Sequence, residues 1–251
     1  MSPVSGPLLS PVADAAARTT AAGTARLLAA WCTGSPLPEA ADRRCEGVAD
    51  LAGRRARVSQ SLFFTAGATA ALSGHRDDPV ARDLSGDSVM IYDGANAYVQ
   101  VGGSWTGFFL ADPGGPRGPN DPLWPLDALF GASGGAVEIG PEAVRGVPAT
   151  RYRLTVDLAR ADAALPAGVS VPSGPYRSLR ALPAEVWLDA AGLARRISVN
   201  SEPASADAVW SIVELWDFGV AADITPPGPD ELLAPAEAFR LAEEESSAPE
   251  A

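Results

Sequence analysis

Few residues of this 251-residue chain could do chemistry, and they are scattered along it. The only histidine, His75, lies in a polar stretch with no second histidine or cysteine nearby, so neither a zinc site nor a serine triad has the partners it needs. Glu185 and Asp189 could act as paired acid and base carboxylates, but Asp189 also suits a turn, and they are two of 31 acidic residues. We therefore predict that the protein is not an enzyme.

Cofactor motifs and nucleic-acid signals are also missing. The chain has no GxSxG, Walker or dinucleotide motif, and its Gly-rich stretch "GGPRGPNDP" has prolines where a phosphate loop needs backbone N–H groups. The formal net charge of -12 opposes contact with phosphate backbones. We predict no cofactor and no nucleic-acid partner.

The two cysteines, Cys32 and Cys45, flank the connection "TGSPLPEAADRR". If the flanking strands meet there, a disulfide could close this loop and restrict the unfolded chain by roughly 3 kcal/mol. Two unpaired, half-buried thiols fit the same spacing. The sequence leaves both alternatives open.

The elements that would position any site are short. Alternating apolar residues between glycine and proline turns predict nine or ten antiparallel strands, with an N-terminal helix and one or two short helices between strands. This combination predicts an α+β, mainly β fold, in which a single large curved antiparallel sheet wraps around the helices as a half-open barrel. An acidic tail, "EEESSAPEA", follows.

One short segment carries much apolar surface. In "PNDPLWPLDALFGASGG" we predict a helix of about three turns that is capped by Asp121 and ends at Gly131. Its apolar stripe must be buried against another element.

Several strands are apolar on both faces. Val186 and Leu188 oppose Trp187, and Val213 and Leu215 oppose Trp210 and Ile212. One face should pack on helices and the other should line a dry space, and both a filled sandwich core and a ligand cavity satisfy this pattern.

The chain resembles the actinobacterial cell-envelope lipoproteins of the LppX and LprG type, which share the LolA/LolB-like fold. The resemblance rests on phrases that follow the order of that family over most of residues 23–227: "GTARLLAAW", "EGVADLAGRRARV", "IYDGANAYVQVGGSW", "DPLWPLDALFGA", "EIGPEAVRGVPATRYRLTVDLARADAALP", "LPAEVWLDAAGLARRISV" and "VELWDFGVAADITPP". It implies an antiparallel half-barrel whose concave side holds acyl chains, and a protein that binds or ferries lipids or lipoglycans in the cell envelope. The expected organisation is an N-terminal helix packed on the sheet in 1–22, the lipid-binding half-barrel in 23–227, and a largely disordered acidic tail in 228–251.

Family members are usually exported and lipidated, whereas this chain shows no signal peptide, and Trp31 precedes Cys32 where a lipobox would have a small residue. A cytoplasmic protein and a mature envelope domain both fit that observation.

The leading hypothesis is a monomeric, non-catalytic carrier for a hydrophobic molecule, with a membrane or envelope protein as a further partner. The alternative is a LolA-like sensing or protein-interaction module with a filled core and no lipid cargo. The strand residues expected to line the cavity are Val89, Ile91, Tyr98, Trp105, Tyr152, Leu154, Trp187, Trp210 and Ile212, with Trp124, Leu126, Leu129 and Phe130 at its entrance. A register error of one residue would turn a whole strand set to the opposite face.

Overall fold

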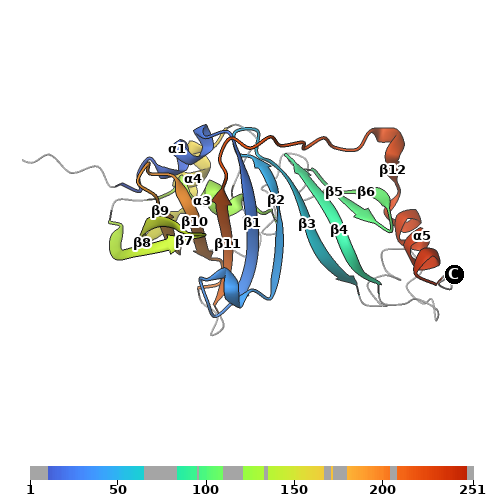
Figure 1. Ribbon diagram of the computed structural model, residues 1–251, viewed down its shortest axis with the longest axis horizontal. Coiled ribbons are helices and arrows are strands. Elements are labelled where there is room, and N and C mark those ends of the chain that lie inside the picture. Colours follow the sequence, from blue (N-terminus) through green and yellow to red (C-terminus); the bar gives the residue numbers. More distant parts are fainter. Residues whose placement is uncertain are drawn as a thin grey trace, which may run out of the picture.

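The computed structural model describes residues 11–64, 84–94, 96–109, 121–132, 135–166, 171, 180–203 and 208–247. His75 lies outside these residues. All strands belong to one twelve-stranded sheet with the order β12-β6-β5-β4-β3-β2-β1-β11-β10-β9-β8-β7 (Figure 1). Neighbouring strands are antiparallel, except that β12 runs parallel to β6. The predicted fold class, a mainly β protein built on one large curved sheet, is confirmed.

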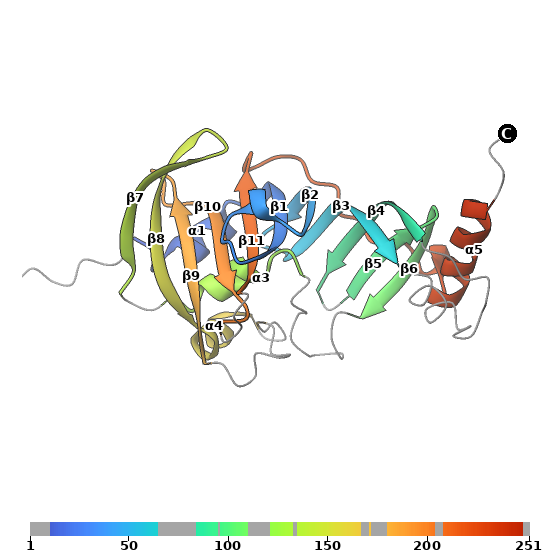
Figure 2. The same ribbon diagram turned by 90° about the horizontal axis from the view of Figure 1, so that it is seen from below.

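The strands are β1 (Thr24–Thr33), β2 (Arg43–Asp50), β3 (Arg55–Phe64), β4 (Leu84–Asp93), β5 (Asn96–Val101), β6 (Ser104–Phe109), β7 (Val137–Val144), β8 (Val147–Asp157), β9 (Ala181–Leu188), β10 (Ala194–Asn200), β11 (Val209–Trp216) and β12 (Leu232–Leu233). The helices are α1 (Ala15–Ala21), α3 (Trp124–Leu129), α4 (Leu158–Ala164) and α5 (Pro235–Ser247), with short 3-10 turns η1 (Pro38–Ala40) and η2 (Pro229–Glu231). Figure 2 shows α1, α3 and α4 beside β8 to β11, and α5 at the opposite end of the sheet beside β6.

Two aspartate side chains hold the ends of their elements. Asp157 caps α4, because its carboxylate accepts a hydrogen bond of 2.9 Å from the backbone N–H of Arg160. Asp189 closes the β9–β10 hairpin, since its Oδ1 accepts from the N–H groups of Ala191 and Leu193 at 2.9 Å each. The Asp189 carboxylate thus stabilises the turn by accepting backbone hydrogen bonds, as its position in the sequence indicated.

The predicted helix at 121–131 is present but shorter than expected. The Asp121 carboxylate accepts a hydrogen bond of 2.8 Å from the Leu123 N–H, and α3 then runs for six residues. Gly131 serves a different purpose from the predicted left-handed stop. A Cβ there would lie 2.1 Å from the carbonyl oxygen of Asp157, so the glycine allows the chain to pass directly against the end of β8.

The prediction that 228–251 is largely disordered is wrong for residues 229–247. These residues form η2, β12 and α5, and α5 packs against β4, β5 and β6. Ala238 and Phe239 are fully buried, and Phe239 and Ala242 form a cluster with Val99 and Val101. A few apolar residues on one helical face are enough to dock an otherwise acidic segment.

The two cysteines are free thiols, so the disulfide alternative is wrong. Cys45 lies opposite Ala29 in the main core, while Cys32 belongs to a separate cluster with Leu28, Ala30 and Ile212 on the other face of the sheet. The Cys32 thiol instead donates to the Leu37 carbonyl oxygen at 3.3 Å.

Candidate functional site

The main core fills one end of the concave face. The helix α3 contacts β8, β10 and β11, and all six of its residues are buried. Trp124, Leu126 and Leu129 are at most 2% exposed, and Phe130 is half-buried against the same core. These four residues were predicted at the entrance of a cavity, but the structure places them inside the packed end of the half-barrel.

Two of the predicted wall residues face this interior. Leu154 is part of the main core, and Tyr152 packs against it. Their strand neighbour Val156 is fully buried in the same cluster. Tyr152 and Leu154 therefore lie on the interior face of β8.

Seven predicted wall residues lie on the convex face instead. On β9 and β11 the interior side chains are Val186, Leu188, Val213 and Leu215, which puts their strand neighbours Trp187, Trp210 and Ile212 on the opposite face. On β4 to β6 the interior residues Met90 and Tyr92 pair with Val99 and Ala97, so the convex side carries the alternate residues Val89, Ile91, Tyr98 and Trp105. The physical reason is that both faces are buried, and period-two alternation then marks no interior side.

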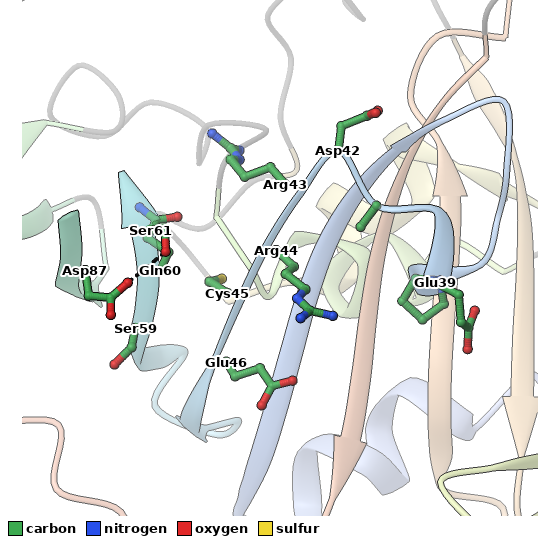
Figure 3. Close-up of a pocket in the computed structure, with 12 residues that line it drawn as sticks. Glu39, Asp42, Arg43, Arg44, Cys45, Glu46, Ser59, Gln60, Ser61 and Asp87 are labelled. Carbon is green, nitrogen blue, oxygen red and sulfur yellow. Dashed lines mark hydrogen bonds between the residues drawn. The ribbon is translucent and has the colours of Figure 1, made fainter. Parts of the chain in front are cut away.

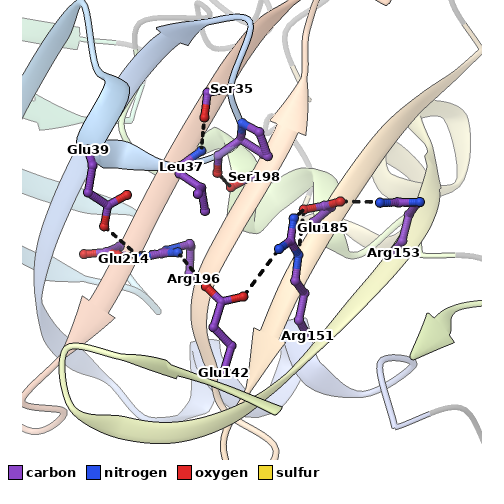
Figure 4. Close-up of polar contacts among 11 residues, drawn as sticks. Ser35, Leu37, Glu39, Glu142, Arg151, Arg153, Glu185, Arg196, Ser198 and Glu214 are labelled. Atoms are coloured by element: carbon purple, nitrogen blue, oxygen red, sulfur yellow. Dashed lines mark hydrogen bonds and ion pairs between the residues drawn. The ribbon is translucent and has the colours of Figure 1, made fainter. Parts of the chain in front are cut away.

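A chain of ion pairs covers the convex face of β8 to β11 (Figure 4). Near one end of this chain, Glu214 accepts from Arg196 at 2.6 Å and from Arg145 at 2.8 Å. Arg196 extends the chain to Glu142 at 3.6 Å. The chain of contacts continues through Glu142–Arg151, Arg151–Glu185 and Glu185–Arg153. The Glu185 carboxylate is therefore engaged by arginines and is no partner of Asp189.

The tryptophans of the convex face belong to this ionic network. The guanidinium of Arg151 lies 4.9 Å and that of Arg196 lies 5.0 Å from the ring centre of Trp187, and that of Arg145 lies 3.6 Å from the ring centre of Trp216. In such cation–π contacts the negative face of the aromatic ring attracts the guanidinium charge. The convex face is thus buried by arginine, carboxylate and tryptophan contacts, which the apolar pattern of the strands did not reveal.

The interior face of β3 to β5 lies beside the packed core and is less completely covered. Met90 is half-buried and packs against both the main core and the separate cluster that holds Phe239 of α5. Its sulfur is 3.6 Å from the Tyr92 hydroxyl oxygen. Val58, Tyr92 and Ala97 surround it on the same face. This surface lies between the two helical ends of the half-barrel, α3 at one and α5 at the other.

A groove opens between β2 and β3. Their ladder runs from Asp50↔Arg55 to Glu46↔Ser59 and stops there. Beyond that point β2 continues along β1 and β3 continues along β4, so the strands diverge. A cavity of about 630 Å³ lies in the fork, lined by Pro38, Glu39, Ala41, Asp42, Arg43, Arg44, Cys45, Glu46, Ser59, Gln60, Ser61 and Asp87 (Figure 3).

Three ionisable groups near the groove, the buried Cys45 and Tyr92 on the interior face and Cys32 on the convex face, are held neutral. Burial raises the pKa of the Cys45 thiol to about 12, and burial also raises the pKa of the Tyr92 hydroxyl. The pKa of the Cys32 thiol is raised to about 11, mainly by burial and to a smaller extent by the negative charges of Asp42 and Glu39. At neutral pH none of these three groups carries the charge of a nucleophile.

Within the described ranges, no group of three or more His, Cys, Asp or Glu side chains is arranged to hold a metal ion. No helix in the described part of the chain is long and apolar enough to cross a membrane.

Comparison with known proteins gives the fold. No family model matches the chain, and no curated protein sequence matches it. The crystal structure of LprF from Mycobacterium bovis is similar, with a TM-score of 0.52 and 14% identity over 87% of this chain and 95% of that one. The Mycobacterium tuberculosis lipoprotein LppX aligns with a TM-score of 0.45 and 12% identity over 86% of this chain and 100% of that one. A LolA superfamily protein from Nitrosomonas europaea aligns with a TM-score of 0.30 and 9% identity over 88% of this chain and 94% of that one. The similarity to LprF supports the LolA-like half-open barrel that the resemblance to the LppX and LprG type implied.

Proposed function

We propose that the protein is a non-catalytic binder or carrier of a hydrophobic ligand, such as the acyl chains of a lipid or lipoglycan, in the cell envelope. The proposed site is the interior face of β3 to β5, between the end filled by α3 and the end covered by α5. Part of this proposal, the envelope location, rests on the resemblance to the LppX and LprG type.

The position of Met90 carries the proposal. It is a half-buried thioether at the junction of two apolar clusters, with Val58, Tyr92 and Ala97 on the same face. Methionine adapts its shape to irregular apolar partners and recurs at surfaces that bind varied hydrophobic molecules. Such a surface offers an acyl chain contact without a specific polar motif.

Hydrophobic burial alone can supply the affinity. Each methylene removed from water contributes about 0.8 kcal/mol, and only part of that sum survives the cost of association. A long acyl chain would therefore bind through area and shape, which agrees with the lack of a recognisable motif in the sequence.

The proposed wall differs from the predicted one. Tyr152 and Leu154 keep their interior place, near the end filled by α3. Trp124, Leu126, Leu129 and Phe130 become the packed end of the site instead of its entrance. The seven convex residues, Val89, Ile91, Tyr98, Trp105, Trp187, Trp210 and Ile212, are no part of it.

A second function is favoured by one observation. The interior under β8 to β11 is filled by α3, whose residues are all buried, as expected for a protein-interaction module without lipid cargo. The two functions differ in whether the β3–β5 face takes up a hydrophobic molecule.

Native mass spectrometry of the protein purified gently from its own host tests the proposal. A carrier should show a population heavier than the bare chain, which organic extraction converts to the bare mass and releases as lipid. Protein that arrives ligand-free and takes up no fluorescent acyl probe would overturn the carrier function and leave the interaction module.

A further inference from the structure

We propose that α5 is a built-in competitor for the hydrophobic site: the Phe239 ring and an acyl chain compete for one apolar patch on β5, formed by Val99 and Val101. This inference rests on the proposed function, because it extends the binding face from Met90 to the surface beneath α5. Figures 1 and 2 both show α5 at the β6 end of the sheet, opposite the end that holds α3. The C-terminal helix thus sets how tightly a hydrophobic ligand binds.

The patch under α5 continues the interior face of the proposed site. Val99 and Val101 are two and four residues beyond Ala97, so all three side chains point to the same face of β5. Ala97 belongs to the main core, which marks this face as the interior one. Phe239 and Ala242 of α5 cover the two valines. The helix therefore lies on the face that we assign to the ligand.

Met90 connects the two apolar regions. It pairs with Val99 across the β4–β5 ladder and packs against both the main core and the cluster that holds Phe239. It is nonetheless only half-buried, so the two regions leave part of its side chain uncovered. A ligand that covers Met90 therefore meets Phe239 next, and it gains further apolar contact in that direction only by displacing the ring.

A small cluster holds α5 to the sheet. Its buried members among the described residues are the two valines of β5 and, from α5, Phe239 and Ala242. Arg240 and Glu244 lie on the exposed side of the helix and pair with each other. The main core contains none of these residues, so α5 can open locally while the rest of the fold stays intact.

The chain that precedes α5 allows the helix to leave without disturbing the sheet. This chain is fixed to β1, where the Thr24 hydroxyl donates to the Val220 carbonyl oxygen at 2.6 Å, and Ile224 is only 5% exposed. It then reaches α5 through β12, which pairs with β6 over two residues. The Thr106 hydroxyl adds a hydrogen bond of 3.0 Å to the Leu233 carbonyl oxygen. A ladder this short can separate while the longer ladders of the sheet persist.

Competition of this kind lowers the apparent affinity in a defined way. If the patch is open in a fraction of the molecules, the apparent dissociation constant equals the intrinsic constant divided by that fraction. A weaker α5 contact raises the open fraction and tightens binding, and by the same linkage a bound ligand raises the fraction in which α5 is detached. Phe239 is the residue to change, because it is fully buried and supplies the aromatic surface of the contact.

Titration of the full chain with cis-parinaric acid, a fatty acid whose polyene chain fluoresces in apolar surroundings, tests the inference. Phe239→Ala should bind this probe at least about tenfold more tightly than the wild type, because the shortened side chain competes less well for the valines. Arg240→Ala, the neighbouring change on the exposed side of α5, should keep the wild-type affinity. Circular dichroism checks that both variants are folded.

Hydrogen exchange of the wild type gives a readout that needs no variant. Saturating probe should speed amide exchange in residues 235–247 at least about threefold, without faster exchange in β1 or β11. Slower or unchanged exchange in α5 would overturn the inference, as would equal probe affinities of Phe239→Ala and the wild type. Failure of the proposed function differs from both results: if neither the wild type nor Phe239→Ala binds the probe, the carrier function is contradicted together with the inference.

Discussion

Arg54 donates a hydrogen bond of 2.8 Å from Nη1 to the Asp127 Oδ1, and both side chains are buried, at 8% and 3% exposure. Arg54 lies in the tight β2–β3 turn with a φ of 52°, and Asp127 lies in the first turn of α3. The contact thus fixes α3 to the hairpin that begins the groove. The sequence alone does not indicate this buried pair, because arginine and aspartate are normally exposed.

Asp127→Asn should destabilise the protein by about 3–5 kcal/mol, because it removes the negative charge that pairs with the buried Arg54 guanidinium at 2.8 Å. Urea unfolding measures this change. Glu244→Ala removes an exposed pair with Arg240 on α5 and should cost at most about 1 kcal/mol. Equal losses in the two variants would mean that the Arg54–Asp127 pair adds nothing to the fold.

Leu126→Ala should lower the free energy of unfolding by about 2–5 kcal/mol, since Leu126 is 2% exposed in the packed end of the half-barrel. Phe130→Ala should cost less, because Phe130 is half-buried. Chemical unfolding of both variants checks the order. If Leu126→Ala left stability unchanged and weakened only the binding of an acyl probe, α3 would be a lid and not part of the core.

Gly47→Ala should destabilise the sheet and weaken the β2–β3 ladder, because the new Cβ would meet the Arg57 carbonyl oxygen at 1.9 Å. Gly107→Ala on β6 is its control, since the nearest atom to a Cβ there is a Tyr98 ring carbon at 3.9 Å. Thermal unfolding should show a lower Tm for Gly47→Ala and a nearly unchanged one for Gly107→Ala. The opposite order would exclude a close strand crossing at Gly47.

Stability should decline above about pH 9 because burial raises the pKa of the Cys45 thiol to about 12. The thiol of the unfolded chain ionises from about pH 8.5 upward, whereas the folded thiol keeps its proton. The full free energy of unfolding is therefore present below about pH 8.5, and part of it is lost as the pH rises towards the folded pKa. The loss is at most about 1.4 kcal/mol per pH unit. Urea unfolding of Cys45→Ala between about pH 8 and 10 should show a shallower decline than the wild type. An unchanged slope would show that the thiol does not carry this linkage.

The sequence predicted the architecture because turns and caps are local. Asp157, Asp189 and Asp121 lie at the element ends where their carboxylates accept backbone hydrogen bonds, and the alternating strands gave the sheet. The α5 helix was missed because its acidic composition outweighed a short apolar face, although Ala238, Phe239 and Ala242 have helical spacing.

The faces of the strands could not be predicted from periodicity. Trp187 and Trp210 are as apolar as the Val186 and Val213 side chains opposite them, and the convex face is buried by arginines that lie far away in the sequence. The groove was equally hidden, because it depends on where the β2–β3 ladder stops. A glycine inside a strand, Gly47, is the sequence signal that could have indicated a close backbone approach.

Binding of a fluorescent acyl probe to two neighbouring variants on β4 tests the central claim most directly. Met90 faces the interior and Val89 faces the convex side, and both are half-buried. If the β3–β5 interior binds hydrophobic ligands, Met90→Glu should weaken probe binding by at least about tenfold, because it places a charge on the apolar wall. Val89→Glu should retain near wild-type affinity, with circular dichroism confirming that both variants are folded. Equal affinities in the two folded variants, or a wild type that binds no probe, would contradict the account.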